Sequence, residues 1–249
     1  MAGHSKFKNI MYRKGAQDAK RAKLFTKLIR ELTVAARAGG GDPAGNPRLR
    51  TAISAARAAN LPKDTLERAI RRGAGNDDGA NYEEIRYEGY GPSGVALIVE
   101  ALTDNRNRSA AEIRTAFNKH GGSLGETNSV SFQFERVGLV QYAVDKVAEA
   151  KIFEAALDAG AENVETDAAL HEVTCATEDF NTVCEALENA FGPPDSAGLV
   201  WKPKTTTSVD EGDAETLFRL IEVLEDNDDV QTVSANYEIS DEAIAKLSA

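Results

Sequence analysis

The chain has 249 residues, of which 28% are charged, and its 29 Lys and Arg stand against 40 Asp and Glu for a formal net charge of −11. A chain of this length exceeds a typical single domain, so we expect two or three domains. Its two cysteines do not make a disulfide framework, and its three histidines do not fall at zinc-binding spacing. We therefore expect no metal and no cofactor.

The start of the chain is charged and polar, and it lacks the apolar core of roughly 7 to 15 residues that a secretory signal needs. No apolar run approaches the roughly 20 residues that cross a bilayer. We therefore expect a cytoplasmic protein that has no membrane partner.

Charge is distributed unevenly along the chain. Residues 1–72 contain 17 basic and 5 acidic residues, a net charge of +12, whereas the remainder contains 12 basic and 35 acidic residues, a net charge of −23. A basic block of this density attracts polyanions, and the acidic remainder repels them. The pattern predicts that nucleic acid is bound mainly from the N-terminal end, with a merely solvated basic surface as the alternative.

The first 16 residues show no apolar periodicity, so we expect a tail that is mobile until it meets a partner. Cations beside aromatic rings suit phosphate contact and stacking on exposed bases. An ordinary disordered tail is the alternative interpretation. The cations and rings of this tail are Lys6, Lys8, Arg13 and Lys14, with Phe7 and Tyr12 between them.

Residues 18–38 are predicted to form an amphipathic helix, because apolar residues recur at steps of three and four. The apolar stripe comprises Phe25, Leu28, Ile29, Leu32 and Ala36. At about 100° per residue, the cations fall on the opposite side of the helix. These cations are Lys20, Lys23, Lys27, Arg30 and Arg37.

Two more helices follow, and together the three predict a small bundle. Asn46 is a suitable cap for the second helix and Pro47 a suitable first residue, while Pro62 opens the third helix and Gly73 ends it. Arg68, Arg71 and Arg72 project away from the third apolar stripe. No single recognition helix stands out, and cations spread over the bundle favour contact with backbone phosphates or structured RNA.

The acidic remainder predicts an α+β fold. After a glycine-rich break at residues 73–81, strands are expected at 82–90, 95–102 and 130–134, with a helix at 109–120. Residues 138–204 show the order strand, helix, strand, strand, helix, strand, which is typical of a ferredoxin-like domain. A helix at 214–224 and a strand at 230–239 remain to complete the preceding sheet.

The expected fold class is therefore α+β, with an N-terminal three-helix bundle followed by two α+β domains, one discontinuous and one ferredoxin-like. The expected domains are 1–75 (basic helices and tail), 79–137 with 205–241 (discontinuous α+β), and 138–204 (inserted ferredoxin-like).

Two glycine-rich segments resemble phosphate-binding loops. Residues 89–94 match G-x-G-x-x-G, but a strand follows where the dinucleotide fingerprint needs a helix, so we expect a hairpin turn. The loop at 121–129, which begins with Gly121 and Gly122, is a possible anion-binding contact through its backbone amides, with a long flexible connection as the alternative. Arg106 and Arg108 are a second possible contact, with pairing to local carboxylates as the alternative.

No spacing marks a nucleophile with a base or a set of metal ligands, so we expect no catalytic residues and no small-molecule substrate. The segment from Asp210 to Glu242 holds 12 carboxylates against the single cation Arg219, which indicates a solvated acidic face.

Several segments resemble one protein family and run in order through most of the chain. They are MAGHSKFKNI, RKGAQDAKRAKLFTKLIRELTVAAR, GNPRLRTAI, LPKDTLERAIRRG, YEGYGPSGVALIVEALTDNRNR and GGSLGETNSVSF. Together they resemble the YebC/PmpR family, which includes the mitochondrial translational activator of cytochrome oxidase. The chain has Phe7 where the family usually has Trp, and Ile10-Met11-Tyr12 where it has Ile-Lys-His, which keeps an aromatic residue but removes one cation.

The resemblance implies a three-domain, non-enzymatic cytoplasmic protein. Members are described as DNA-binding transcriptional regulators and, for some, as ribosome-associated factors that assist elongation through difficult sequences such as proline runs. We therefore expect a nucleic-acid-binding regulator whose partner is DNA or, alternatively, ribosomal RNA. The residues expected to contact it are Lys6, Lys8, Arg13, Lys14, Lys20, Lys23, Lys27, Arg30, Arg68, Arg71 and Arg72.

Overall fold

Helices and strands occupy most of residues 17–75 and 81–239, which are the residues that the computed structural model describes. The chain divides into two compact units. The first contains residues 1–30, 78–135 and 203–249, and the second contains residues 31–77 and 136–202, so that the division falls after Arg30 within a helix.

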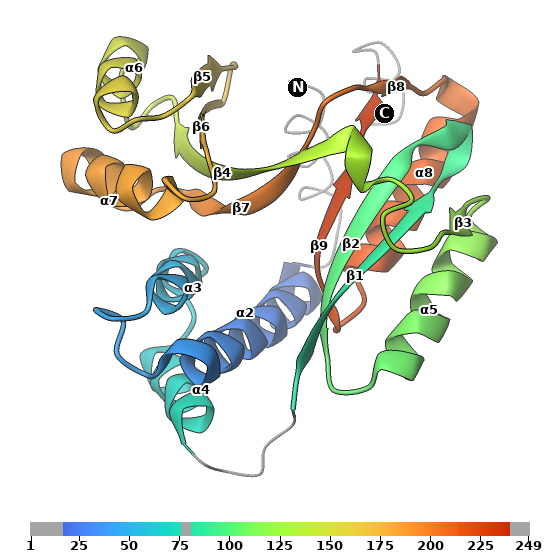
Figure 1. Ribbon diagram of the computed structural model, residues 1–249, viewed down its shortest axis with the longest axis horizontal. Helices are drawn as coiled ribbons and strands as arrows, with labels where there is room; N and C mark the ends of the chain where they lie inside the picture. The colour runs from blue at the N-terminus through green and yellow to red at the C-terminus, as the bar shows by residue number, and fades with distance from the viewer. Residues whose placement is uncertain (1–16, 76–80, 240–249) are drawn as a thin grey trace. The chain divides into compact units, whose positions relative to one another are not determined.

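The three predicted N-terminal helices are confirmed as α2 (Gln17–Gly39), α3 (Pro47–Ala58) and α4 (Lys63–Ala74) (Figure 1). The Asn46 side chain caps α3, because its Oδ1 accepts a hydrogen bond from the backbone N–H of Leu49 at 3.0 Å. Its Nδ2 donates to the carbonyl oxygens of Ala35 at 2.7 Å and Gly40 at 2.9 Å. One buried amide group therefore hydrogen-bonds carbonyl oxygens at the end of α2 and a backbone N–H at the start of α3.

Close packing joins α2 to α4 within the second unit. Gly73 of α4 lies so near α2 that a Cβ added to it would come within 2.2 Å of the Thr33 carbonyl oxygen. The surrounding core is aliphatic and small, as the apolar stripes predict. Its fully or nearly fully buried members are Leu32, Ala35, Ala36, Leu49, Ala52, Ile53, Ala56, Leu66 and Ala69.

The first unit contains a four-stranded sheet in the order β3-β1-β2-β9. These strands are β3 (Ser123–Leu124), β1 (Glu83–Tyr90), β2 (Ala96–Thr103) and β9 (Val230–Ala235). Strand β9 comes from the far end of the chain and pairs antiparallel with β2, placing Val233 opposite Val99. Helices α5 (Arg106–Lys119) and α8 (Glu211–Glu225) pack on one face of the sheet (Figure 1).

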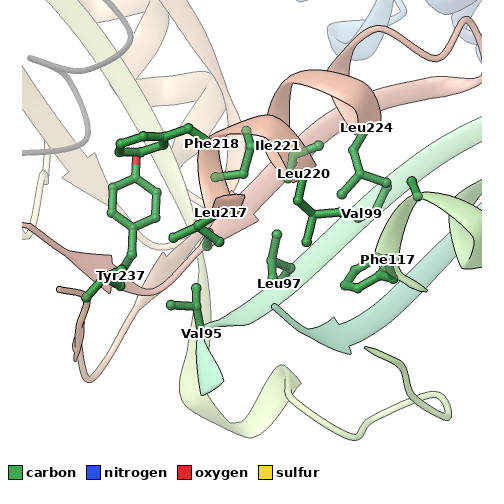
Figure 2. Packing of buried hydrophobic residues seen from close by; sticks show 14 of the residues in the cluster. Val95, Leu97, Val99, Phe117, Leu217, Phe218, Leu220, Ile221, Leu224 and Tyr237 are labelled. Atoms are coloured by element: carbon green, nitrogen blue, oxygen red, sulfur yellow. The ribbon is translucent and has the colours of Figure 1, made fainter. Parts of the chain in front are cut away.

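Apolar side chains from the sheet and both helices form one core (Figure 2). Leu97 and Val99 of β2 face Leu217 of α8 and Phe117 of α5, and all four are fully buried. Burying each such side chain stabilises the fold by roughly 1.5–3 kcal/mol. At the edge of this core, Phe218 and Tyr237 pack edge to face with ring centroids 5.7 Å apart.

The prediction of a strand over residues 130–134 is wrong. Residues Ser131–Gln133 form a 3₁₀ turn, η2, and the next strand begins only at Phe134. The backbone N–H groups of Val130 and Ser131 donate to the carboxylate of Glu88, so they are not available to a neighbouring strand.

The strand predicted over residues 230–239 is interrupted at Asn236. It forms β9 and then β10 (Tyr237–Glu238), which pairs in parallel with β8 (Thr207–Ser208). The Asn236 side chain is buried, and its Oδ1 accepts a hydrogen bond from the backbone N–H of Ala96 at 2.8 Å. The chain therefore leaves one ladder and joins another at this residue.

The G-x-G-x-x-G segment is confirmed as a hairpin turn. It joins the antiparallel strands β1 and β2 through a short 3₁₀ turn, η1 (Pro92–Gly94). Ser93 and Gly94 have φ values of 56° and 73°, so the turn uses left-handed backbone rather than the start of a helix.

The second unit contains a sheet in the order β5-β6-β4-β7, which is the ferredoxin-like order expected for the predicted strand and helix sequence. Its elements are β4 (Phe134–Ala143), α6 (Glu149–Asp158), β5 (Asn163–Thr166), β6 (Leu170–Cys175), α7 (Phe180–Phe191) and β7 (Ser196–Pro203). Val140, Ile152, Val173 and Leu187 are fully buried between the sheet and the two helices. The fold class is α+β, as predicted, while the expected domain boundaries stay predictions.

Replacing Gly73 with Ala should destabilise the protein by about 1–3 kcal/mol, because the added methyl group collides with the Thr33 carbonyl oxygen and α4 has to move away from α2. Urea unfolding followed by circular dichroism measures this loss. Gly45→Ala is the matched control, since a Cβ at Gly45 meets nothing within 4 Å. Equal midpoints for the two variants would contradict the packing described.

Candidate nucleic-acid interface

The structure describes only some of the residues predicted to contact nucleic acid. Lys6, Lys8, Arg13 and Lys14, with Phe7 and Tyr12, lie outside the described residues. Lys20 belongs to α2, but its side chain is likewise outside the description. The cations that the structure places are those from Arg21 onward in α2 and those of α3 and α4.

Three predicted contact residues of α2 bind the protein's own acidic loop, which we define as residues 225–229. The Lys23 Nζ lies 3.0 Å from a carboxylate oxygen of Asp226. The Lys27 Nζ donates to the Glu225 carbonyl oxygen at 2.6 Å, and burial lowers the pKa of Lys27 even though the nearby carboxylates oppose that shift. Arg30 Nη1 donates to the Asp228 carbonyl oxygen at 2.7 Å.

Asp229 is the centre of this contact. Its side chain is 4% exposed, and its Oδ1 accepts from Arg30 Nη1 at 2.6 Å. Its Oδ2 accepts from Arg108 at 2.8 Å, from Ser109 at 2.7 Å and from Thr103 at 3.1 Å. Burial alone would raise the pKa of Asp229, but hydrogen bonds from Ser109, Arg108, Arg30 and Thr103 lower it to about 2.

The same network accounts for Arg108, which the sequence offered as a possible second contact. Arg108 Nη2 lies 2.9 Å from Asp104 and 2.8 Å from Asp229, and hydrogen bonds to these carboxylates raise its pKa. Arg108 therefore forms ion pairs with carboxylates of the protein, as the alternative interpretation of this residue expected. Arg106 is exposed, as Arg108 is.

Three predicted contact residues of α4 are exposed. Leu66, Ala69 and Gly73 bury one side of the helix, and Arg68, Arg71 and Arg72 therefore point away from it. Their spacing of three and four residues places them on one face of α4. Within residues 17–75 and 81–239, no carboxylate forms an ion pair with any of these three arginines. Arg57, in the last turn of α3, is also exposed.

The end of the glycine-rich loop at 121–129, together with the two residues that follow it, binds a carboxylate of the protein itself. Glu88 of β1 is 1% exposed, and its carboxylate accepts backbone N–H hydrogen bonds from Asn128 at 3.0 Å, Val130 at 2.9 Å and Ser131 at 2.8 Å. Burial alone would raise the pKa of Glu88, but these bonds and the Arg86 guanidinium together lower it. Sequence reasoning missed Glu88, because no local pattern distinguishes it among 40 acidic residues.

Gly121 and Gly122 serve the geometry of the same loop. Gly121 has a φ of 71°, which favours glycine, and a Cβ on Gly122 would come within 2.6 Å of the Tyr90 carbonyl oxygen. The loop therefore passes close to the end of β1.

In the ferredoxin-like part of the second unit, one buried histidine is hydrogen-bonded and both cysteines are protonated thiols. His171 is buried, with Nδ1 2.9 Å from Thr166 Oγ1 and Nε2 2.9 Å from the Val147 carbonyl oxygen. Burial raises the pKa of the Cys175 and Cys184 thiols to about 11, so both are protonated at neutral pH. Across the described ranges, no group of three His, Cys, Asp or Glu side chains is arranged to hold a metal ion.

None of the helices in the described part of the chain combines the length and the apolar character needed to span a membrane.

Comparisons with known proteins match nearly the whole chain. Residues 5–76 match the model of the TACO1/YebC protein N-terminal domain, and residues 82–237 match that of the TACO1/YebC second and third domain, which also carries a transcription-regulator designation. A similar solved structure is the crystal structure of a conserved hypothetical protein from Aquifex aeolicus. It is 47% identical, with a TM-score of 0.84, and the match covers 90% of this chain and 93% of that chain.

Asp229→Asn should lower the free energy of unfolding by about 3 kcal/mol at pH 7, because Arg30 and Arg108 then face a neutral amide in a buried site. A carboxyl group whose pKa falls from 3.8 to about 2 on folding contributes about 2 kcal/mol above pH 4, and this contribution disappears as the pH falls toward 2. Urea unfolding at several pH values should therefore show the difference between variant and wild type narrowing below pH 4.

Asp228→Asn is the matched control for that measurement, since Asp228 is exposed, and we expect a change of less than about 0.5 kcal/mol. Stability curves of Asp229→Asn and wild type that stay parallel from pH 7 to pH 2 would refute the role given to this carboxylate.

Proposed function

The chain belongs to the TACO1/YebC family, and from this premise we propose that it is a nucleic-acid-binding regulator of gene expression that acts in the cytoplasm by binding rather than by catalysis. The family's transcription-regulator designation supports DNA as the target. The phosphate-binding surface we propose is the exposed arginine face of α4, formed by Arg68, Arg71 and Arg72.

This proposal depends on a difference between two helices: three cations of α2 contact carboxylates and carbonyl groups of the protein, whereas the arginines of α4 are exposed. The cations Lys23, Lys27 and Arg30 of α2 already contact the acidic loop, so a phosphate has to displace internal partners to reach them. The α4 arginines have no such partners among the described residues, and a guanidinium binds phosphate through a planar pair of N–H donors. We therefore expect phosphates to bind the arginines of α4 rather than the cations of α2.

The N-terminal cations Lys6, Lys8, Arg13 and Lys14 stay in the hypothesis as contacts expected from the sequence. They precede α2 in the chain and would add to the electrostatic attraction exerted by the bundle.

A second candidate is a translation factor that binds ribosomal RNA, and the position of the arginines on α4 favours it. Helices that read DNA bases usually present side chains from their N-terminal end to the major groove. In α4 the first turn contains Asp64, whereas Arg71 and Arg72 lie in the last turn. Cations in that position suit contact with phosphates along a folded RNA rather than recognition of base edges.

The variant Arg68→Gln/Arg71→Gln/Arg72→Gln should weaken binding to duplex DNA and to folded RNA to a similar degree across sequences. Each lost phosphate contact removes roughly 0.9 from the slope of log K against log salt for duplex DNA, so the slope should fall by about 2 to 3. Fluorescence anisotropy between 50 and 300 mM salt, with a labelled 20-base-pair duplex and a labelled RNA hairpin, measures this change.

The matched control is Arg114→Gln/Lys119→Gln/Arg219→Gln, which removes the same charge from exposed positions on α5 and α8. This control should leave the salt slope unchanged within error. Equal slopes for the α4 variant and wild type would rule out α4 as the phosphate-binding surface.

Sedimentation of cell lysate through a sucrose gradient distinguishes the two targets. If the chain regulates transcription, it should stay at the top of the gradient after DNase treatment. If it is a translation factor, it should migrate with ribosomes, resist DNase and be released by high salt. Failure of the purified protein to bind either polymer at 50 mM salt would remove both candidates.

A further inference from the structure

Phe132 is an aromatic residue that the fold holds out in solvent. Its side chain is 68% exposed, more than any other large hydrophobic side chain in the described part of the protein. It is the middle residue of the 3₁₀ turn η2, immediately after the segment that binds Glu88. The ring is therefore not part of the protein's own core, and packing does not explain why an aromatic residue occurs here.

Hydrogen bonds fix the backbone on the N-terminal side of Phe132. The N–H groups of Val130 and Ser131 both donate to the same Glu88 oxygen, at 2.9 Å and 2.8 Å. Bonds from N–H groups to a buried carboxylate are stronger than those between neutral groups. Solvation by water cannot easily replace them, because the Glu88 side chain is fully buried.

The residue after Phe132 is held equally firmly. The Gln133 N–H donates to the Val130 carbonyl oxygen at 2.9 Å, and the Gln133 carbonyl oxygen accepts from the Lys204 N–H at 2.8 Å. Its side chain donates to Tyr90 Oη at 3.2 Å and accepts from Asn236 Nδ2 at 3.0 Å. The turn is therefore anchored to β1 and to the segment that separates β9 from β10.

The surroundings of Phe132 do not form an apolar docking surface. Its chain neighbours, Ser131 and Gln133, are polar, and the other exposed large hydrophobic side chains of the described residues belong to different elements. These are Leu24 in α2, Phe153 and Leu157 in α6, Leu199 in β7 and Val223 in α8. A stable protein interface needs a contiguous apolar area, whereas one flat ring matches the face of one nucleobase.

We propose that Phe132 is a stacking site for an unpaired base of a single-stranded nucleic-acid segment, an inference that rests on the proposed function. The site adds an uncharged contact to the phosphate contacts of α4. Because the backbone is already fixed, binding orders little more than the ring itself, which limits the entropic cost. Stacking tolerates any base, since every base has a π face, so the site selects unpaired over paired nucleic acid rather than a sequence.

The test compares Phe132→Ala, Phe132→Leu and Phe132→Trp in the full chain, with a labelled unstructured 15-nucleotide RNA and a labelled RNA hairpin as probes. Phe132→Ala and Phe132→Leu should weaken binding of the unstructured RNA about tenfold and leave binding of the hairpin stem within twofold. Phe132→Trp should retain the affinity, because it keeps a ring. The salt slope should be the same for all variants, since no charge changes.

Phe153→Ala is the matched control, because Phe153 is also exposed, at 54%, but lies on α6. It should not change affinity for either probe. Thermal unfolding of each variant checks that the fold is intact, which the exposure of both rings leads us to expect.

The outcomes separate this inference from the proposed function. If wild type binds neither of these probes nor the labelled 20-base-pair duplex, the proposed function fails. If wild type binds the duplex but not the unstructured RNA, the stacking site is wrong while the proposed function stands. If wild type binds and Phe132→Ala retains full affinity for the unstructured RNA, the stacking site is wrong while the proposed function stands. Equal losses for Phe132→Ala and Phe132→Trp, or equal losses on both probes, would also overturn the stacking site.

Discussion

The buried carboxylate of Asp229 joins α2, β2 and α5 at the end of α8. A charge can occupy such a site only when it is fully paired, and here two guanidinium groups and two hydroxyl groups meet it. This requirement commits Arg30 and Arg108 to the fold. It also determines which cations remain for a partner, because the adjoining backbone and side chains of the acidic loop bind Lys23 and Lys27 as well.

Local patterns in the sequence predicted most of the helices and strands. The spacing of Leu32 and Ala36, the cap at Asn46 followed by Pro47, and the strand and helix order of residues 138–204 all depend on neighbours within a few residues. The turn at Ser131 could not be predicted in this way, because its cause is Glu88, 43 residues earlier. Val130 and Phe132 are of residue types that favour strands, so a pattern that does not include Glu88 predicts a strand here.

The same limit applies to the candidate interface. The amphipathic pattern of α2 correctly separates cations from the apolar stripe, but it cannot reveal that Arg30 meets an aspartate 199 residues away. In α4 the periodicity was sufficient, since the exposure of Arg68, Arg71 and Arg72 depends only on burial of the opposite side of one short helix. Predictions of exposed charge are thus most reliable where no acidic segment returns to the helix.

The two buried carboxylates also differ in what they organise, since Glu88 binds backbone amides and Asp229 binds side chains.

The late position of β9 has a consequence for how the chain is made. Asp229 follows Arg108 by 121 residues, so at roughly 5–20 residues per second about 6–24 s pass between synthesis of that arginine and synthesis of its buried partner, and until then only Asp104 can pair with it. The ferredoxin-like sheet, whose strands all lie between residues 134 and 203, is completed earlier. Vectorial synthesis therefore favours closure of the second sheet first, and it leaves the edge of β2 open to other strands until the last segment emerges.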